Sequence, residues 1–221
     1  MFEDRTEAGE RLADALEELE LPDPVVMALP RGGLPVALPV ARRLGAPLEL
    51  LLVRKIGLPG SPEFAAGAIV DTPDGGEAVF NTEVLRAFGM RESDFDAELA
   101  EKRKELDARR RRFMGGRMPT PVAGRSAVIV DDGIATGATV RAALAGLKSQ
   151  DPARIVLAVP VAPPDTVQAL RGDVDHLICL DTPRAFQAVS LHYRSFDQVS
   201  DDTVAQLMET ARAEHDERTS R

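Results

Sequence analysis

Apolar runs alternate with amphipathic segments along most of this chain. The apolar runs have the length and composition of strands buried on both faces, and they lie at 25–29, 48–53, 127–130, 155–159 and 176–180. Between and around them, apolar residues spaced three or four apart predict helices at 4–20, 34–44, 137–148, 164–171 and 201–214. Pro39 predicts a kink or a late start in the second of these helices, and we expect residues 215–221 to fray. Strands that alternate with helices predict an α/β fold with a mostly parallel sheet.

The middle of the chain interrupts this alternation. Residues 55–63 are rich in Gly and Pro, which predicts a loop. Two strands, 64–70 and 77–81, are predicted on either side of a turn at 71–76. Residues 81–117 are highly charged, with few apolar positions. We interpret this last segment as a helical insertion that lies over the core or contacts a second subunit.

Composition narrows the class of protein. A chain of 221 residues that is 44% hydrophobic and 29% charged is expected to form one large domain with a sizeable core. Its net charge of -9 makes a nucleic-acid partner unlikely. One cysteine, Cys179, excludes an internal disulfide framework. The acidic N-terminus is unlike a signal peptide, and no apolar run reaches the roughly 18 residues of a membrane span. We therefore expect a cytoplasmic protein without a membrane partner.

One segment carries the clearest chemical pattern. An apolar strand runs into Asp131 and Asp132, a loop of small and hydroxyl residues follows, and a helix begins at Gly137. Ligands of open parallel sheets bind at the carboxyl ends of strands, so these residues lie where a ligand would bind. Backbone N–H groups at the start of a helix suit a phosphate, whereas two carboxylates suit hydroxyls or a cation. A sugar phosphate suits both features, with its phosphate on the loop and its hydroxyls on the carboxylates.

Residues 128–139, VIVDDGIATGAT, resemble the phosphoribosyl-pyrophosphate (PRPP) signature of type I phosphoribosyltransferases. The family usually has a branched apolar residue where Gly133 stands. The order of strands and loops resembles the family over about 20–180. The resemblance implies one domain, 1–221, with a doubly wound, mostly parallel sheet and a small hood. It also implies an enzyme that displaces pyrophosphate from PRPP by a nucleobase or related small-molecule acceptor with Mg²⁺, and a homodimer, since dimers are common in the family.

The same resemblance assigns roles to the residues of the signature. Asp131 and Asp132 would bind the ribose hydroxyls, directly or through Mg²⁺. The loop that follows would hold the 5-phosphate of PRPP through Ala135, Thr136, Gly137, Ala138 and Thr139.

Basic residues after two other strands would face the pyrophosphate. The turn Pro30–Gly33 looks like the family's pyrophosphate loop, in which a non-proline cis peptide is often found, so the resemblance implies contacts from Arg31, Gly32 and Gly33. Arg54 and Lys55 end the second core strand, where the family often has basic residues. The predicted catalytic set is Arg31, Lys55, Asp131 and Asp132. The hairpin between about Gly57 and Asn81, with a hinge at 57–60, would be the mobile catalytic loop.

The acceptor is left open by the sequence. The hood would be built from 181–198 and part of the N-terminus, with Tyr193 and Phe196 contacting the base or packing the hood. Members that act on 6-oxopurines usually have an Asp where Ala135 stands, which disfavours a hypoxanthine-guanine enzyme. The alternative function is a non-catalytic regulatory protein that senses PRPP or a nucleotide on the same fold.

Overall fold

The computed structural model describes residues 1–59, 61–72 and 76–220, with the backbone alone for 61–64. Contacts divide the chain into two compact units. The first unit comprises Met1–Leu51, Val122–Gly137 and Asp151–Arg221. The second comprises Leu52–Pro121 and Ala138–Gln150. Gly60 of the predicted hinge and 73–75 of the predicted turn lie outside the described residues.

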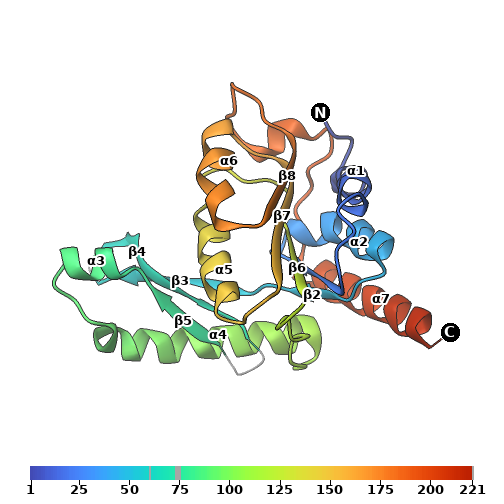
Figure 1. Ribbon diagram of the computed structural model, residues 1–221. Helices are drawn as coiled ribbons and strands as arrows, with labels where there is room; N and C mark the ends of the chain where they lie inside the picture. Colours follow the sequence, from blue (N-terminus) through green and yellow to red (C-terminus); the bar gives the residue numbers. More distant parts are fainter. Residues whose placement is uncertain (60, 73–75, 221) are drawn as a thin grey trace. The chain divides into compact units, whose positions relative to one another are not determined.

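The first unit contains a five-stranded parallel sheet with the order β2-β1-β6-β7-β8 (Figure 1). Its strands are β1 (Pro24–Ala28), β2 (Leu48–Leu50), β6 (Ser126–Val130), β7 (Arg154–Val161) and β8 (His176–Asp181). Every residue of the central strand β6 is buried. An interior strand of a parallel sheet covered on both faces has no exposed side, which explains its unbroken apolar sequence. The predicted α/β fold with a parallel sheet is confirmed.

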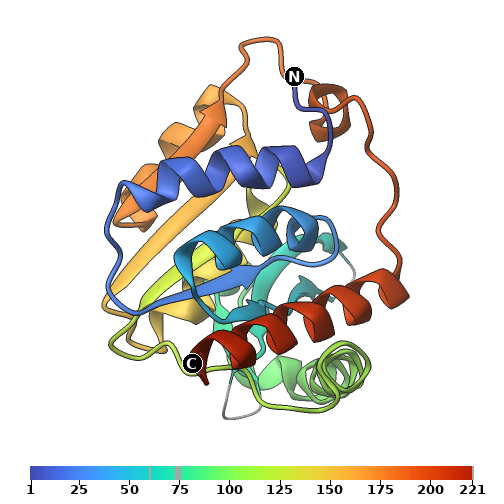
Figure 2. The same ribbon diagram turned by 90° about the vertical axis from the view of Figure 1, so that its right-hand side faces the viewer.

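Helices cover both faces of this sheet. Three of them, α1 (Arg5–Glu17), α2 (Gly33–Leu44) and α7 (Asp201–Thr219), lie on one face, and α6 (Pro164–Leu170) lies on the other (Figures 1 and 2). The prediction of a late start for α2 is wrong, because the helix begins at Gly33 and includes Pro39. Pro39 is buried where α2 meets Gly9 of α1. This packing offsets the backbone hydrogen bond that the proline removes.

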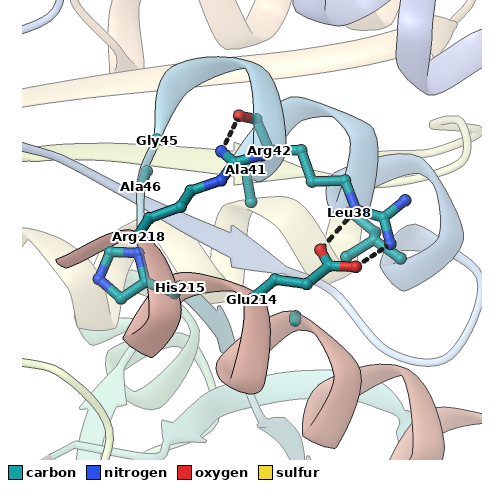
Figure 3. Close-up of a pocket in the computed structure, with 9 residues that line it drawn as sticks. Leu38, Ala41, Arg42, Gly45, Ala46, Glu214, His215 and Arg218 are labelled. Atoms are coloured by element: carbon teal, nitrogen blue, oxygen red, sulfur yellow. Dashed lines mark hydrogen bonds and ion pairs between the residues drawn. The ribbon is translucent and has the colours of Figure 1, made fainter. Parts of the chain in front are cut away.

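The last helix is longer than predicted. Residues 215–219 continue α7, so the predicted fraying is wrong for them. Two contacts to α2 fix this end: Arg42 forms a bidentate ion pair with Glu214, at 2.6 and 2.7 Å, and Arg218 donates to the carbonyl oxygen of Arg42 (Figure 3). The cationic side chain of Arg218 also suits the carbonyl end of α2. These tertiary contacts are invisible to helical periodicity.

The second unit contains an antiparallel sheet, β3-β4-β5. Its strands are β3 (Val53–Leu58), β4 (Ser61–Val70) and β5 (Glu77–Phe80), and its helices are α3 (Thr82–Ala87), α4 (Asp96–Met114) and α5 (Ala138–Lys148). The loop predicted at 55–63 is wrong, since 55–58 and 61–63 belong to β3 and β4. Alternating burial of Ile56 and Leu58 is the strand signal that the neighbouring Gly and Pro obscured.

The predicted strand at 48–53 is divided in the structure. The backbone N–H of Leu51 donates to the carbonyl oxygen of Ala28, next to the β1–β2 pairing, whereas the carbonyl of Leu52 accepts from the N–H of Asp71. The hydrogen bonding of the chain therefore changes from the parallel sheet to the antiparallel one at this point. The change occurs within an apolar run, LELLLV, which contains no breaking residue.

The segment 81–117 is largely helical. It contains α3, the 3-10 helix η1 (Glu92–Phe95) and α4. Leu99, Leu106 and Phe113 form the buried stripe of α4. Two further 3-10 helices, η2 (Arg171–Asp173) and η3 (Val189–His192), belong to the first unit. In the described part of the chain, no helix combines the length and apolar character that crossing a membrane requires.

Candidate functional site

The acidic pair lies at the carboxyl end of the central strand of the parallel sheet. Strand β6 ends at Val130, and Asp131 and Asp132 follow directly. One carboxylate oxygen of Asp131, Oδ1, accepts a hydrogen bond from the backbone N–H of Asp132 at 2.9 Å. Burial raises the pKa of Asp131 well above its usual value, and the neighbouring charge of Asp132 adds to this rise. Asp131 and Asp132 are therefore adjacent, partly buried carboxylates at the carboxyl end of β6.

The turn after β1 packs against this acidic pair. Its Pro30–Arg31 peptide bond is cis, as the resemblance to the pyrophosphate loop implied. A Cβ atom added to Gly32 would overlap the carboxylate of Asp132, lying 2.6 Å from its Cγ. A Cβ at Gly33 would lie 2.9 Å from the Cα of Asp131. Only glycines allow this approach, so the structure brings Gly32 and Gly33 into contact with Asp131 and Asp132.

Arg31 lies on the same turn with its side chain half exposed. Its guanidinium is 3.4 Å from a carboxylate oxygen of Asp201, the first residue of α7. A pair of this length at an exposed position is weak. The side chain can therefore exchange Asp201 for an anionic ligand at little cost.

The loop after the acidic pair is anchored at two points. The N–H of Ile134 donates to the carbonyl oxygen of Val161 at 2.9 Å, and the hydroxyl of Thr166 donates to the carbonyl oxygen of Ala135 at 2.8 Å. The side chains of Ala135 and Thr136 are exposed, and Gly137 has a φ of +75°. Ala138 and Thr139 follow as the first residues of α5, which is grouped with the second unit.

The structure explains why a glycine, Gly133, stands where the family usually has a branched apolar residue. A Cβ at this position would lie 2.6 Å from Val189 and 3.0 Å from Val161. Val189 belongs to η3, in the segment that was predicted to form the hood. The branched side chain that the family usually has at 133 is therefore replaced in space by Val189, which comes from a distant part of the chain.

The N-terminus and the segment 186–198 lie side by side (Figures 1 and 2). Phe2 donates its N–H to the carbonyl of His192 and accepts at its own carbonyl from Arg194. The ring of Tyr193 is buried between Phe2 and Phe196, with centroid distances of 5.4 and 5.0 Å. The structure gives Tyr193 a packing role. Base contact by Tyr193 and Phe196 stays a prediction.

Two groups from these segments hold Asp132. The Nε of Arg5 donates to Oδ2 of Asp132 at 2.8 Å, and the hydroxyl of Tyr193 donates to its backbone carbonyl at 2.5 Å. Burial raises the pKa of Asp132, and the hydrogen bond from Arg5 opposes that rise. Burial also raises the pKa of Tyr193, which keeps its hydroxyl protonated as a donor. Sequence reasoning missed Arg5, because no motif contains it and its partner lies 127 positions away.

Arg54 and Lys55 lie in the second unit, on β3. Arg54 donates to the carboxylate of Glu105 on α4 at 3.2 Å and to the carbonyl oxygen of Val53 at 3.1 Å. Its side chain is mostly buried, at 21% exposure, whereas Lys55 is exposed. Of the two, Lys55 is the residue more accessible to a ligand. Their predicted pyrophosphate contacts stay predictions.

The donor set at the acidic pair fits Mg²⁺. Mg²⁺ prefers oxygen ligands and is commonly held by one or two carboxylates together with waters and substrate oxygens. Asp131 and Asp132 supply two carboxylates. Within the described ranges, no group of three or more His, Cys, Asp or Glu side chains could hold a metal without such additional ligands. The site therefore suits an ion that arrives with its substrate.

Known proteins resemble this chain along most of its length. The pattern of the family described as "Phosphoribosyl transferase domain" matches residues 5–194. Two Mycobacterium tuberculosis proteins, "Putative phosphoribosyl transferase MT0597" and "Putative phosphoribosyl transferase Rv0571c", are each 45% identical to it over 211 residues. That alignment covers 96% of this chain and 47% of each relative, so the chain spans about half their length.

A solved structure has a similar fold. The crystal structure of TT1426 from Thermus thermophilus is 42% identical, has a TM-score of 0.83, and is matched over 94% of this chain and 97% of that one. The family pattern covers Arg5, the turn Pro30–Gly33, and the acidic pair with the loop that follows it. The segment VIVDDGIATGAT resembles the PRPP signature of that family. The chain belongs to the phosphoribosyltransferase family.

Proposed function

We propose that this chain is a phosphoribosyltransferase that displaces pyrophosphate from PRPP by a nucleobase or related acceptor, with Mg²⁺. The observation that carries the proposal is the packing of Gly32 and Gly33 against Asp131 and Asp132 at the carboxyl end of β6. This arrangement joins the predicted pyrophosphate turn to the predicted ribose-binding pair. A simple capped connection between a strand and a helix would not need two glycines pressed against two carboxylates.

Each part of the proposed site has a distinct task. The carboxylates of Asp131 and Asp132 accept hydrogen bonds from the ribose hydroxyls, and a hydrogen bond to a charged group contributes about 1.5–3 kcal/mol. The 5-phosphate binds the loop Ala135–Thr139, where backbone N–H groups at the start of α5 favour an anion. Arg31 binds the pyrophosphate from the exposed turn. Bound Mg²⁺ would neutralise negative charge on the departing pyrophosphate.

The reaction exchanges one bond at ribose C1 for another. The bond from C1 to the pyrophosphate oxygen breaks, and the pyrophosphate leaves with the electron pair. A bond forms between C1 and a nitrogen of the acceptor, and the proton that this nitrogen loses passes to the released pyrophosphate. The transition state resembles an oxocarbenium ion, as in glycoside hydrolysis. Negative charge on Asp131 and Asp132 favours the positive charge that develops on the sugar ring.

Lys55 is proposed to stabilise the leaving group from the second unit. It is exposed on β3, at the start of the hairpin that the resemblance identifies as the catalytic loop. An ammonium group suits the negative charge that builds on pyrophosphate during the reaction. Arg54 is a second candidate, although its guanidinium already binds Glu105. A homodimer and a cytoplasmic location stay predictions.

Pyrophosphate release from PRPP and Mg²⁺ tests this function directly. The full chain is assayed against a panel of purine, pyrimidine and non-standard acceptors. Release that depends on one acceptor supports the transferase and identifies its substrate class. Lys55→Ala is expected to lower kcat more than it weakens PRPP binding. If no acceptor of the panel supports pyrophosphate release although PRPP still binds, the result favours the sensing function and contradicts the proposed enzyme.

A further inference from the structure

The guanidinium of Arg5 is fixed on three sides beside the acidic pair. Its Nε donates to Oδ2 of Asp132, one Nη1 proton is donated to the carbonyl oxygen of Asp197 at 2.8 Å, and its Cζ lies 3.7 Å from the centroid of the Phe196 ring. The side chain is 11% exposed. Stacking on an aromatic face and a fixed hydrogen bond both restrict the rotamers of arginine. Arg5 is therefore an ordered group and differs from a mobile surface cation.

Residue 132 is held at both of its polar ends. Arg5 binds its carboxylate, and the Tyr193 hydroxyl binds its backbone carbonyl. On another side, the backbone of Gly32 lies against the same carboxylate. Asp131 has no comparable arginine among the ion pairs of the described residues. Arg5 therefore forms its direct ion pair with the second carboxylate of the acidic pair.

We propose that Arg5 is a positioning residue for Asp132, and this inference rests on the proposed function. Arg5 occupies Oδ2, so Oδ1 is the oxygen that is directed to a ribose hydroxyl. Phe196 and Asp197 act by holding Arg5 in place, which gives the segment 186–198 a task in sugar binding. The N-terminal helix and this segment then contribute to affinity for the ribose phosphate, independently of the acceptor.

A second arrangement makes the opposite prediction. If Arg5 blocks Asp132 until the sugar displaces it, removing the arginine frees both carboxylate oxygens and strengthens sugar binding. If Arg5 only joins the N-terminus to the tail, its removal changes stability and leaves the affinity of the folded protein unchanged. The sign of the change in affinity therefore separates positioning from competition and from simple packing.

Calorimetric titration with ribose 5-phosphate, in the presence and absence of Mg²⁺, tests the proposal on the full chain. We expect Arg5→Gln to weaken binding by about 10- to 100-fold, by analogy with the range seen when a residue that orients a metal-ligating side chain is removed. Arg5→Lys keeps the charge without the planar geometry and should weaken binding less. Arg43→Gln is the matched control, because Arg43 also pairs with carboxylates of the N-terminal helix, Asp14 and Glu17, but at exposed positions. Its affinity should stay within about twofold of wild type.

Asp132→Asn provides the test of action through Asp132. In that background, Arg5→Gln should cause no further loss of affinity, since the two residues act as one unit. Additive losses would overturn the proposal, and so would unchanged or tighter binding by folded Arg5→Gln. Fluorescence of Tyr193, the one tyrosine in a chain without tryptophan, reports whether segment 186–198 remains docked. If Arg5→Gln does not fold, Arg5→Lys decides by the same criteria.

Failure of the proposed function gives a different result. If wild type binds neither ribose 5-phosphate nor PRPP, the proposed function fails and the role of Arg5 fails with it. If wild type binds and Arg5→Gln binds equally well, the proposed function stands and only the role of Arg5 is overturned.

Discussion

Each unit of the molecule contains an Asp–Arg pair in which both side chains are mostly buried, and these two pairs differ in how many carboxylate oxygens remain available to a ligand. In the second unit, Arg110 binds both carboxylate oxygens of Asp71, whose side chain is fully buried. In the first unit, Arg5 binds one oxygen of Asp132, which is 14% exposed. A carboxylate with both oxygens engaged has a structural task, whereas one that is held by a single oxygen can still bind a ligand. The two carboxylates differ in burial as well, with Asp71 at 0% exposure and Asp132 at 14%.

The largest effect is expected from breaking the buried pair. Arg110→Gln leaves the carboxylate of Asp71 buried without its cation, and such a loss costs about 3–5 kcal/mol. Urea denaturation followed by circular dichroism should show this decrease in the free energy of unfolding. Arg111→Gln, which changes the exposed neighbouring residue, should stay within about 0.5 kcal/mol of wild type. Equal stability of the two variants would remove the structural role assigned to the Asp71–Arg110 pair.

A smaller effect of opposite sign is expected at the acidic pair. Burial raises the pKa of Asp131, so folding disfavours its ionised form. Asp131→Asn removes that penalty and keeps an oxygen that can accept from the N–H of Asp132. We expect the variant to be more stable than wild type by about 1 kcal/mol at neutral pH, within the usual range for substitutions that remove a functional group at a cost in activity. This gain should accompany a loss of sugar binding.

The difference in stability between Asp131→Asn and wild type is expected to depend on pH with a defined sign. The unfolded chain ionises Asp131 near its usual pKa of about 3.9, whereas the folded chain keeps the proton to a higher pH. Between these two values the folded state binds more protons, so its stability falls as pH rises. Thermal denaturation at pH values rising from about 4 should show an advantage for Asp131→Asn that grows until the pH passes the folded-state pKa of Asp131. A constant or shrinking advantage over that range would contradict the assigned cause.

The sequence predicted the parallel sheet well because its strands are mostly apolar and the helices that cover it have regularly spaced apolar residues. The signature at 128–139 also placed the acidic pair and the loop that follows it at the end of a buried strand, which is where the structure has them. Strand β3 was missed because Gly57 and Pro59 obscured the alternation of Ile56 and Leu58. In that region, pairing with β4 determines the conformation more strongly than the turn propensity of the residues does.

Contacts between distant segments could not be predicted in the same way. Val189 fills the space beside Gly133, and Arg5 binds Asp132, yet neither residue belongs to a motif. For the contact between Val189 and Gly133, the sequence did offer one sign, because a glycine stands where the signature usually has a branched residue. An unexpected glycine in a binding segment can therefore indicate that another side chain occupies its space.

The most direct test of the central claim is a calorimetric titration of wild type and of the variant Asp131→Asn with Asp132→Asn, using PRPP and Mg²⁺. A double variant with the same change in charge, Glu17→Gln with Glu18→Gln, serves as the control outside the site. The account predicts that wild type and control bind PRPP and that binding by the acidic-pair variant is abolished. Unchanged affinity in the acidic-pair variant would contradict the assignment of Asp131 and Asp132 to the ribose hydroxyls.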